Sequence, residues 1–372
     1  MRLGIDVSTY FEELDHGAVY YDGDKQVEPL SLIRGNGADI MRIRLWVHPY
    51  DESGKPYLAG TCDLNNFIKL AKLAEQKGFD VMLDFHYSDF WCDPAKQRIP
   101  KSWEHGDIDK LAATVYDYTV STLKTIKEQG ITVKFIQVGN EVTNGFLWPL
   151  GEIKRAENSP LGESFDGFKK LLNMGIKACR EVAPQASLVL HLERSYDQDL
   201  YNDFYSHMTD VDYDIIGFSY YPYWHGTFDQ LFANVENLKK FGKRLMCVEL
   251  GYGFTVEDYM KNAHGSAHLV VDVTVAESLG FTHDYPLTPE GQAKFVKDFL
   301  ARAEKHGLEA VCYWEPLWIP GDGICWASIE AQKYLNAGEP KEARNEWANQ
   351  CLFDYEGRKL PAFDEFKIKS KK

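Results

Sequence analysis

The stretch Asp80-Val-Met-Leu-Asp-Phe-His86 points to the fold, because its apolar residues follow one another without strict polar alternation. A strand with this composition is typically buried on both faces, as strands of a parallel sheet are. Similar short apolar runs recur along the chain at residues 3–7, 40–46, 133–139, 187–192, 214–220, 245–250 and 310–314. Together the runs predict eight parallel strands.

Helical patterns separate these runs. Residues 64–77 place apolar side chains at the i, i+3 and i+4 spacing of one helix face, and Gly78 follows as a C-terminal signal. Further helices are expected over 111–129 and 167–182, and another begins at Pro289 after the N-cap Thr288. Strands that alternate with helices, with no linker between them, predict a single (β/α)8 TIM barrel over residues 1–372, with a short tail after about residue 361.

The longest connections follow the third, fourth, seventh and eighth strands, at about residues 87–108, 142–163, 251–287 and 315–361. Active sites of such barrels are built by the loops at the C-terminal ends of the strands. The loop lengths therefore predict a substrate cleft at that face.

Composition narrows the classes of ligand. The chain has 41 basic and 56 acidic residues and a net charge of −15, which disfavours nucleic acid, anionic membranes and anionic substrates. No apolar run is long enough to span a bilayer, and the N-terminus lacks a signal-peptide pattern. We therefore expect a monomer that is cytoplasmic, or secreted with its leader removed. The cysteine spacing predicts neither a disulfide framework nor a zinc site, and no nucleotide-binding motif indicates a cofactor.

Two glutamates stand at strand ends. Glu141 follows the fourth strand and Glu249 ends the seventh, so both side chains are expected in the barrel mouth. A pair of carboxyl groups facing a cleft is what glycoside hydrolysis needs, with one protonated to donate and one ionised to attack. The alternative is that each glutamate only pairs with a basic residue inside the barrel.

Other polar residues accompany this pair. Asn140 could bind a sugar hydroxyl or merely form a turn. Arg42 and Arg44 alternate onto one face of the second strand, and we expect Arg44 to be the cation beside Glu249. His86 shares a face with Asp84 and is either a site residue or a satisfied core histidine. A metal site with His191 is considered, but no ligand spacing supports it.

Tryptophans fall mainly at strand ends and in loops, at positions 91, 103, 148, 224, 314, 318, 326 and 347. In the core they would be ordinary packing residues. In loops they favour flat platforms for sugar rings.

Long motifs then identify the chain as similar to glycoside hydrolase family 53, the endo-β-1,4-galactanases. They are GIDVS (4–8), MRIRLWVHPYD (41–51), VMLDFHYSDFWCDPAKQRIPKSW (81–103), IQVGNEVTNGFLWP (136–149), IIGFSYYPYWHGTF (215–228), CYWEPLWIP (312–320) and NEWANQCLFD (345–354). The resemblance covers essentially the whole chain. It implies a retaining enzyme that cleaves β-1,4-galactan, the neutral side chain of pectic rhamnogalacturonan and type I arabinogalactan.

By that resemblance Glu141 is the general acid/base and Glu249 the nucleophile. The resemblance places Arg44, His86, Asn140, Tyr220 and Trp314 around the sugar at the cleavage point, and Trp91 and Trp347 at outer subsites. Leu250-Gly251 departs from the Thr-Ala that usually follows the nucleophile. Residues 254–271 lack the Asp/Asn cluster with which bacterial members often bind calcium, so no metal is expected.

Two other readings of the same residues stay open. One is a related β-mannanase or endoglucanase with the same carboxylates and different loops. The other is a galactan-binding relative without catalytic activity, which the presence of both glutamates and Asn140 disfavours.

Overall fold

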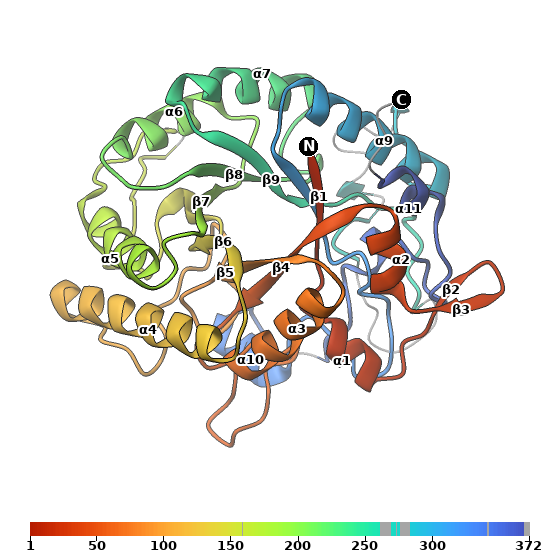
Figure 1. The fold of residues 1–372 in the computed structure, drawn as a ribbon, viewed down its shortest axis with the longest axis horizontal. Helices are drawn as coiled ribbons and strands as arrows, with labels where there is room; N and C mark the ends of the chain where they lie inside the picture. Colours follow the sequence, from red (N-terminus) through yellow and green to blue (C-terminus); the bar gives the residue numbers. More distant parts are fainter. Residues whose placement is uncertain (158, 261–268, 273, 276–282, 341, 368–372) are drawn as a thin grey trace.

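The structure is a computed structural model, and it describes residues 1–157, 159–260, 269–272, 274–275, 283–340 and 342–367. Its centre is a closed parallel barrel in the order β1-β10-β9-β8-β7-β6-β5-β4, ringed by helices (Figure 1). The strands are β1 (Arg2–Asp6), β4 (Ala38–Leu45), β5 (Asp80–Phe85), β6 (Val133–Val138), β7 (Ser187–Leu192), β8 (Ile215–Tyr220), β9 (Arg244–Leu250) and β10 (Ala310–Trp314). The predicted (β/α)8 barrel is confirmed, and each expected strand lies within two residues of its observed bounds.

Helices follow the strands as the periodicity predicts. They are α1 (Tyr10–Asp15), α2 (Pro29–Gly35), α3 (Leu64–Gln76), α4 (Ile108–Glu128), α5 (Asp166–Val182), α6 (Gln198–His207), α7 (Phe228–Leu238), α9 (Pro289–Lys305), α10 (Ile329–Leu335) and α11 (Pro361–Glu365). Short 3-10 helices are η1 (Val142–Asn144), η2 (Lys239–Phe241) and η4 (Ala348–Gln350). Thr288 caps α9 as expected, since its side chain accepts the Gly291 N–H. None of the helices in the described part of the chain is long and apolar enough to cross a membrane.

Two features were not anticipated. A small antiparallel hairpin, β2 (Tyr20–Asp22) with β3 (Lys25–Val27), precedes α2. At the other end of the chain, α11 packs against α9 and buries Ala362 and Phe363, so the segment expected as a tail begins with a docked helix.

The barrel interior is layered. Its lower layer is apolar and formed by Ile40, Met82, Phe135, Val189, Ile215, Met246, Val248, Ala310 and Cys312. β1 contributes Gly4 here, where a Cβ would lie 2.6 Å from the Cys312 Sγ and 3.0 Å from the Ile40 Cβ. Two residues further along their strands, the corresponding positions carry the buried polar groups of Asp6, Arg42, Asp84, Gln137 and His191. The interior thus becomes polar towards the C-terminal ends of the strands, which is where the site lies.

Candidate active site

Glu141 and Glu249 line one cavity of about 650 Å³ at the C-terminal end of the barrel. Asn140, Arg44, His86, Trp91, Trp314 and Trp347 line it as well. The structure therefore brings together all but one of the site residues expected from the sequence. The exception is Tyr220.

The chain turns sharply at Glu141. Its φ is +47°, in the left-handed region that few non-glycine residues adopt, and Gly139 two residues earlier has a φ of +90°. η1 follows immediately. Ser219, in β8, donates a hydrogen bond of 2.6 Å to Glu141 Oε1. The carboxyl group is therefore held by a neutral hydroxyl, with no ion pair to a basic residue among the described residues.

Glu249 lies in a different electrostatic setting. Its Oε1 is 2.9 Å from Arg42, and its Oε2 accepts a 2.9 Å hydrogen bond from the Tyr221 hydroxyl. The side chain is only 9% exposed. A cation and a hydroxyl both favour the ionised carboxylate.

These settings separate the two carboxyl groups. Burial and the Glu249 charge raise the pKa of Glu141 well above its usual value. Burial also raises the pKa of Glu249, but the Arg42 charge and the Tyr221 hydrogen bond oppose this effect. Glu249 is therefore the more acidic member, so Glu141 holds the proton when the pair is singly ionised.

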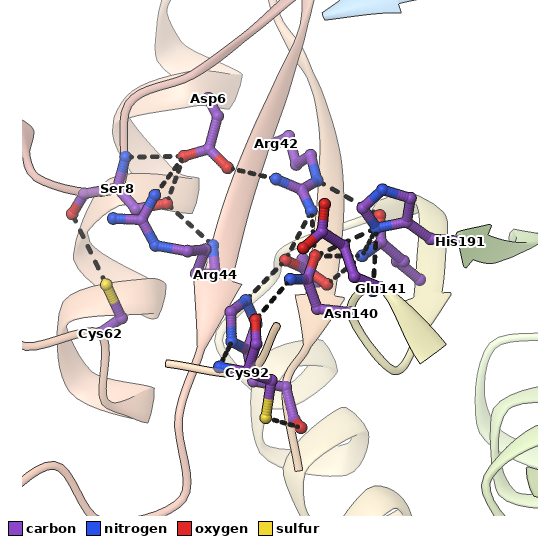
Figure 2. Close-up of polar contacts among 12 residues, drawn as sticks. Asp6, Ser8, Arg42, Arg44, Cys62, Cys92, Asn140, Glu141 and His191 are labelled. Atoms are coloured by element: carbon purple, nitrogen blue, oxygen red, sulfur yellow. Dashed lines mark hydrogen bonds and ion pairs between the residues drawn. The ribbon is translucent and has the colours of Figure 1, made fainter. Parts of the chain in front are cut away.

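Arg42 links several polar side chains at the floor of the site. Its guanidinium contacts Asp6 at 2.7 Å and the Asn140 side-chain oxygen at 2.8 Å (Figure 2). It also contacts Asp84 at 2.8 Å and Glu249 at 2.9 Å. All these groups are buried. The arginine thus holds Asn140 and the Glu249 carboxylate in fixed positions relative to each other.

The expectation that Arg44 is the cation beside Glu249 is wrong. Arg44 pairs with Glu315 at 2.7 Å and with Asp6 at 3.2 Å, and its guanidinium carbon lies 4.5 Å from the centroid of the Trp91 ring. Both arginines point into the barrel, as strand alternation predicts. Which carboxylates they pair with depends on the side chains that neighbouring strands bring within contact distance. Arg44 Nε and Nη2 have no partner in the described structure, although the residue lines the cavity.

Tyr220 does not reach the cavity. Its ring stacks on Phe299 of α9 at a centroid distance of 5.5 Å, and its hydroxyl donates to the Gly226 carbonyl. Side chains alternate along β8, so Ser219 and Tyr221 face inward while Tyr220 faces the helices. The tyrosine of the site is therefore Tyr221, and the placement of Tyr220 around the cleaved sugar is corrected.

His86 and His191 serve different roles. His86 lines the cavity; its Nε2 is 3.0 Å from Asp84, and its Nδ1 accepts the Trp46 indole N–H at 3.2 Å. Burial and the Arg42 charge keep the pKa of His191 well below its usual value, so this imidazole is neutral. Its Nε2 lies 2.8 Å from the Ser219 hydroxyl that binds Glu141.

No group of three or more His, Cys, Asp or Glu side chains with metal-site geometry occurs within the described ranges. Residues 261–268, in the loop considered for calcium, lie outside those ranges.

Aromatic rings form a continuous part of the cavity wall. Trp91 lies 6.3 Å from Trp314, and Trp314 lies 5.1 Å from Trp347, measured between ring centroids. The Trp224 ring comes next, with its centroid 6.0 Å from that of Trp347. Flat apolar rings of this kind suit the C–H faces of a sugar chain.

Further polar residues of the site were missed from the sequence. Among them are Ser219, Tyr221, Glu193 and Arg194, of which the last three line the cavity. Strand alternation could have found Glu193, because it follows the inward-facing His191 by two residues, and Tyr221, because it follows Ser219 by two.

The chain is similar to known proteins along nearly its whole length. The model of a family described as Glycosyl hydrolase family 53 matches residues 2–366. An endo-beta-1,4-galactanase of Bacillus subtilis is 32% identical over 98% of this chain and 84% of its own length. A GH53 catalytic domain from Ignisphaera aggregans has a TM-score of 0.82 at 34% identity, covering 98% of this chain and 94% of that one. A fungal beta-1,4-galactanase structure has a TM-score of 0.75 at 25% identity and covers 98% of each chain.

Proposed function

Because the chain belongs to glycosyl hydrolase family 53, we infer that it is an endo-β-1,4-galactanase, which hydrolyses the β-1,4-galactosidic bonds of galactan and type I arabinogalactan. The observation that carries this inference is that the carboxyl groups of Glu141 and Glu249 line the same cavity in opposite electrostatic settings. Glu249 is paired with Arg42, and Glu141 is bound by the Ser219 hydroxyl. An acid and a nucleophile need this difference.

In the first half of the proposed reaction, the Glu249 carboxylate attacks the anomeric carbon of a galactosyl unit. The bond from that carbon to the leaving oxygen breaks, and Glu141 gives its proton to the leaving oxygen. In the second half a water molecule transfers a proton to Glu141 and attacks the same carbon, which releases Glu249. Configuration is retained, because each half inverts it once.

The charges in the site are consistent with this order of reaction steps. While Glu249 is ionised, its charge keeps the pKa of Glu141 high, so Glu141 carries a proton. Once Glu249 is esterified the charge is gone, the pKa of Glu141 falls, and Glu141 can accept the proton of water.

The rest of the cavity is assigned to substrate. Asn140 is held by Arg42 beside Glu249, which suits it to bind a hydroxyl of the galactosyl unit being transferred. Arg44 and His86 line the same floor, with Trp91, Trp314 and Trp347 as the apolar wall. The partner is thus a neutral polysaccharide, which agrees with the acidic composition.

The test is digestion of a panel of polysaccharides with measurement of reducing ends. We expect release from β-1,4-galactan and none from mannan or cellulose. Proton NMR of the first products should show the β-anomer, with the α-anomer appearing only by mutarotation. An initial α-anomer would contradict the retaining mechanism, and cleavage of mannan or cellulose in preference to galactan would favour the alternative hydrolases.

A further inference from the structure

Glu193 and Arg194 follow β7 directly and line the cavity together with Glu141. Glu193 is 4% exposed, and its Oε1 accepts a 3.1 Å hydrogen bond from Arg194 Nε. The Glu193 backbone N–H donates to the Thr143 hydroxyl in η1, two residues beyond Glu141. These contacts hold the Glu193–Arg194 pair in place in the cavity beside Glu141, although burial raises the pKa of Glu193 to about 7.

The Glu193–Arg194 pair lies closer to Glu141 than to Glu249. The Glu193 charge is among the causes that raise the pKa of Glu141, whereas the main charges acting on Glu249 are those of Arg42, Asp6 and Asp84. β7 also lies next to β6, the strand that leads to Glu141, in the barrel order. The Glu193–Arg194 pair thus belongs to the Glu141 side of the cleft.

The lining differs between the two sides. After β5 and β10 the wall is aromatic, with Trp91, Trp314 and Trp347, and Trp224 after β8 continues it. Near Glu141 it is polar, with Asn144, Glu193, Arg194 and His225. A galactan chain that crosses the cleft meets stacking surfaces at one end and hydrogen-bonding groups at the other.

The chemistry fixes which sugar lies near Glu141. The acid protonates the oxygen that belongs to the leaving galactosyl unit, so that unit has to lie within reach of Glu141. We propose that Glu193 and Arg194 form the binding site for the leaving galactosyl unit, with the carboxylate accepting hydrogen bonds from its free hydroxyls and the guanidinium donating to them. This inference rests on the proposed function.

The same site takes the acceptor in the second half of the reaction. When a galactoside replaces water, its hydroxyl gives its proton to Glu141 and its oxygen bonds to the anomeric carbon. The bond from that carbon to Glu249 breaks at the same step. The Glu193–Arg194 pair therefore controls both cleavage of the polymer and transfer to sugar acceptors.

The experiment compares substrates with and without a leaving sugar. Glu193→Gln and Arg194→Met are assayed on galactan and on β-galactobiosyl fluoride, whose leaving group is fluoride. Arg180→Met is the matched control, because Arg180 lies in α5, does not line the cavity, and forms ion pairs with Asp212 and Asp214. Circular dichroism melting checks that each variant is folded. The Arg194 side chain is 35% exposed, so Arg194→Met still provides a test if Glu193→Gln does not fold.

We expect kcat/KM on galactan to fall about 10- to 100-fold, as lost hydrogen bonds to charged groups imply, while kcat/KM on the fluoride changes less than about threefold. Transfer to added galactobiose, relative to hydrolysis, should fall in the same variants. Equal losses on both substrates, or an unchanged rate on galactan, would overturn the assignment. A wild-type chain that leaves galactan intact would instead overturn the proposed function, on which this assignment depends.

Discussion

The Arg42 guanidinium lies 2.9 Å from the Glu249 carboxylate, and the same group contacts Asp6 and Asp84. One buried cation thus serves three carboxylates at the floor of the cleft. Because the planar guanidinium offers several N–H donors in a fixed geometry, it can hold all of them at once. The ionisation of Glu249 therefore depends on a buried residue that does not itself line the cavity.

Arg42→Lys should move the acidic limb of the pH profile. A lysine ammonium is a point charge that cannot reach all three carboxylates, so Glu249 loses part of its stabilisation and its pKa rises. Since Glu249 has to be ionised, the acidic limb of kcat/KM should shift to higher pH. Arg44→Lys is the comparison, because Arg44 pairs with Glu315 and Asp6. An equal shift in both variants would show that Arg42 has no special role.

Glu141→Ala and Glu249→Ala should fail in different ways. Without Glu141 the enzyme lacks a proton donor, so galactan turnover should fall by about 10²–10⁴. Aryl galactosides with good leaving groups need no proton and should still form the covalent intermediate, which azide can release. Glu249→Ala should be inactive on every substrate. A Glu141→Ala variant that responds neither to the leaving group nor to azide would refute the assigned roles.

Gly251 provides space for Tyr221. A Cβ at position 251 would lie 2.7 Å from the Tyr221 ring and 3.0 Å from the Gln350 side-chain oxygen, so Gly251→Ala has to displace a neighbour. Tyr221 donates to Glu249, and loss of that bond raises the pKa of Glu249. We expect about a tenfold lower kcat/KM and an acidic limb at higher pH, as lost hydrogen bonding to a charged group implies.

The controls separate this effect from general strain. Tyr221→Phe should reproduce the shift, and the double variant should lose little more. Gly35→Ala, where a Cβ meets no atom within 4 Å, should match the wild type. An unshifted pH profile in Gly251→Ala would exclude the coupling.

Trp347→Ala should weaken binding of the polymer. Its partly buried ring lies in the aromatic wall next to Trp314, and a lost sugar-stacking surface is worth about 1–3 kcal/mol. The loss should appear on long galactan and be smaller on a short aryl glycoside. Trp91→Ala should reduce both activities and the melting temperature, since its ring covers Arg44 and its indole donates to the Trp326 carbonyl. Equal losses for Trp347→Ala on both substrates would indicate a purely structural role.

Glu12 should contribute to a fall in stability between about pH 4.5 and pH 7, together with Glu193 and Glu315, whose pKa values burial also raises to about 7. Burial raises the pKa of the Glu12 carboxyl to about 7, and its Oε1 has no partner among the described residues. The folded state therefore keeps a proton that the unfolded chain releases, so the stabilisation is complete below the unfolded pKa and is lost as pH rises through 7. Glu12→Gln should remove about 1–3 kcal/mol of this dependence, as measured by urea unfolding at pH 5 and pH 8. A variant with the wild-type pH dependence would rule out Glu12 as a contributor.

The sequence by itself determined the barrel, the approximate positions of α3, α4, α5 and the start of α9, and the family. The eight apolar runs, the Thr288-Pro289 cap and the motif around Asn140-Glu141 depend on neighbours within a few residues, so local periodicity and composition specify them. The two catalytic candidates also follow, because the end of a barrel strand is defined by the strand itself.

Only the tertiary structure decided which side chains meet. Arg42 and Arg44 share one face of β4, and their different partners depend on groups brought by β1, β5, β9 and the segment after β10. Tyr220 is the last residue of β8 and Tyr221 is the next residue along the chain, yet Tyr220 packs against the helices and Tyr221 contacts Glu249 in the cavity. Glu193 takes its importance from Glu141, 52 positions earlier in the chain, which it approaches only when β6 and β7 pair. Such contacts depend on the length and direction of side chains that meet across the closed barrel. Local patterns in the sequence do not specify these contacts, because the partners are far apart in the chain.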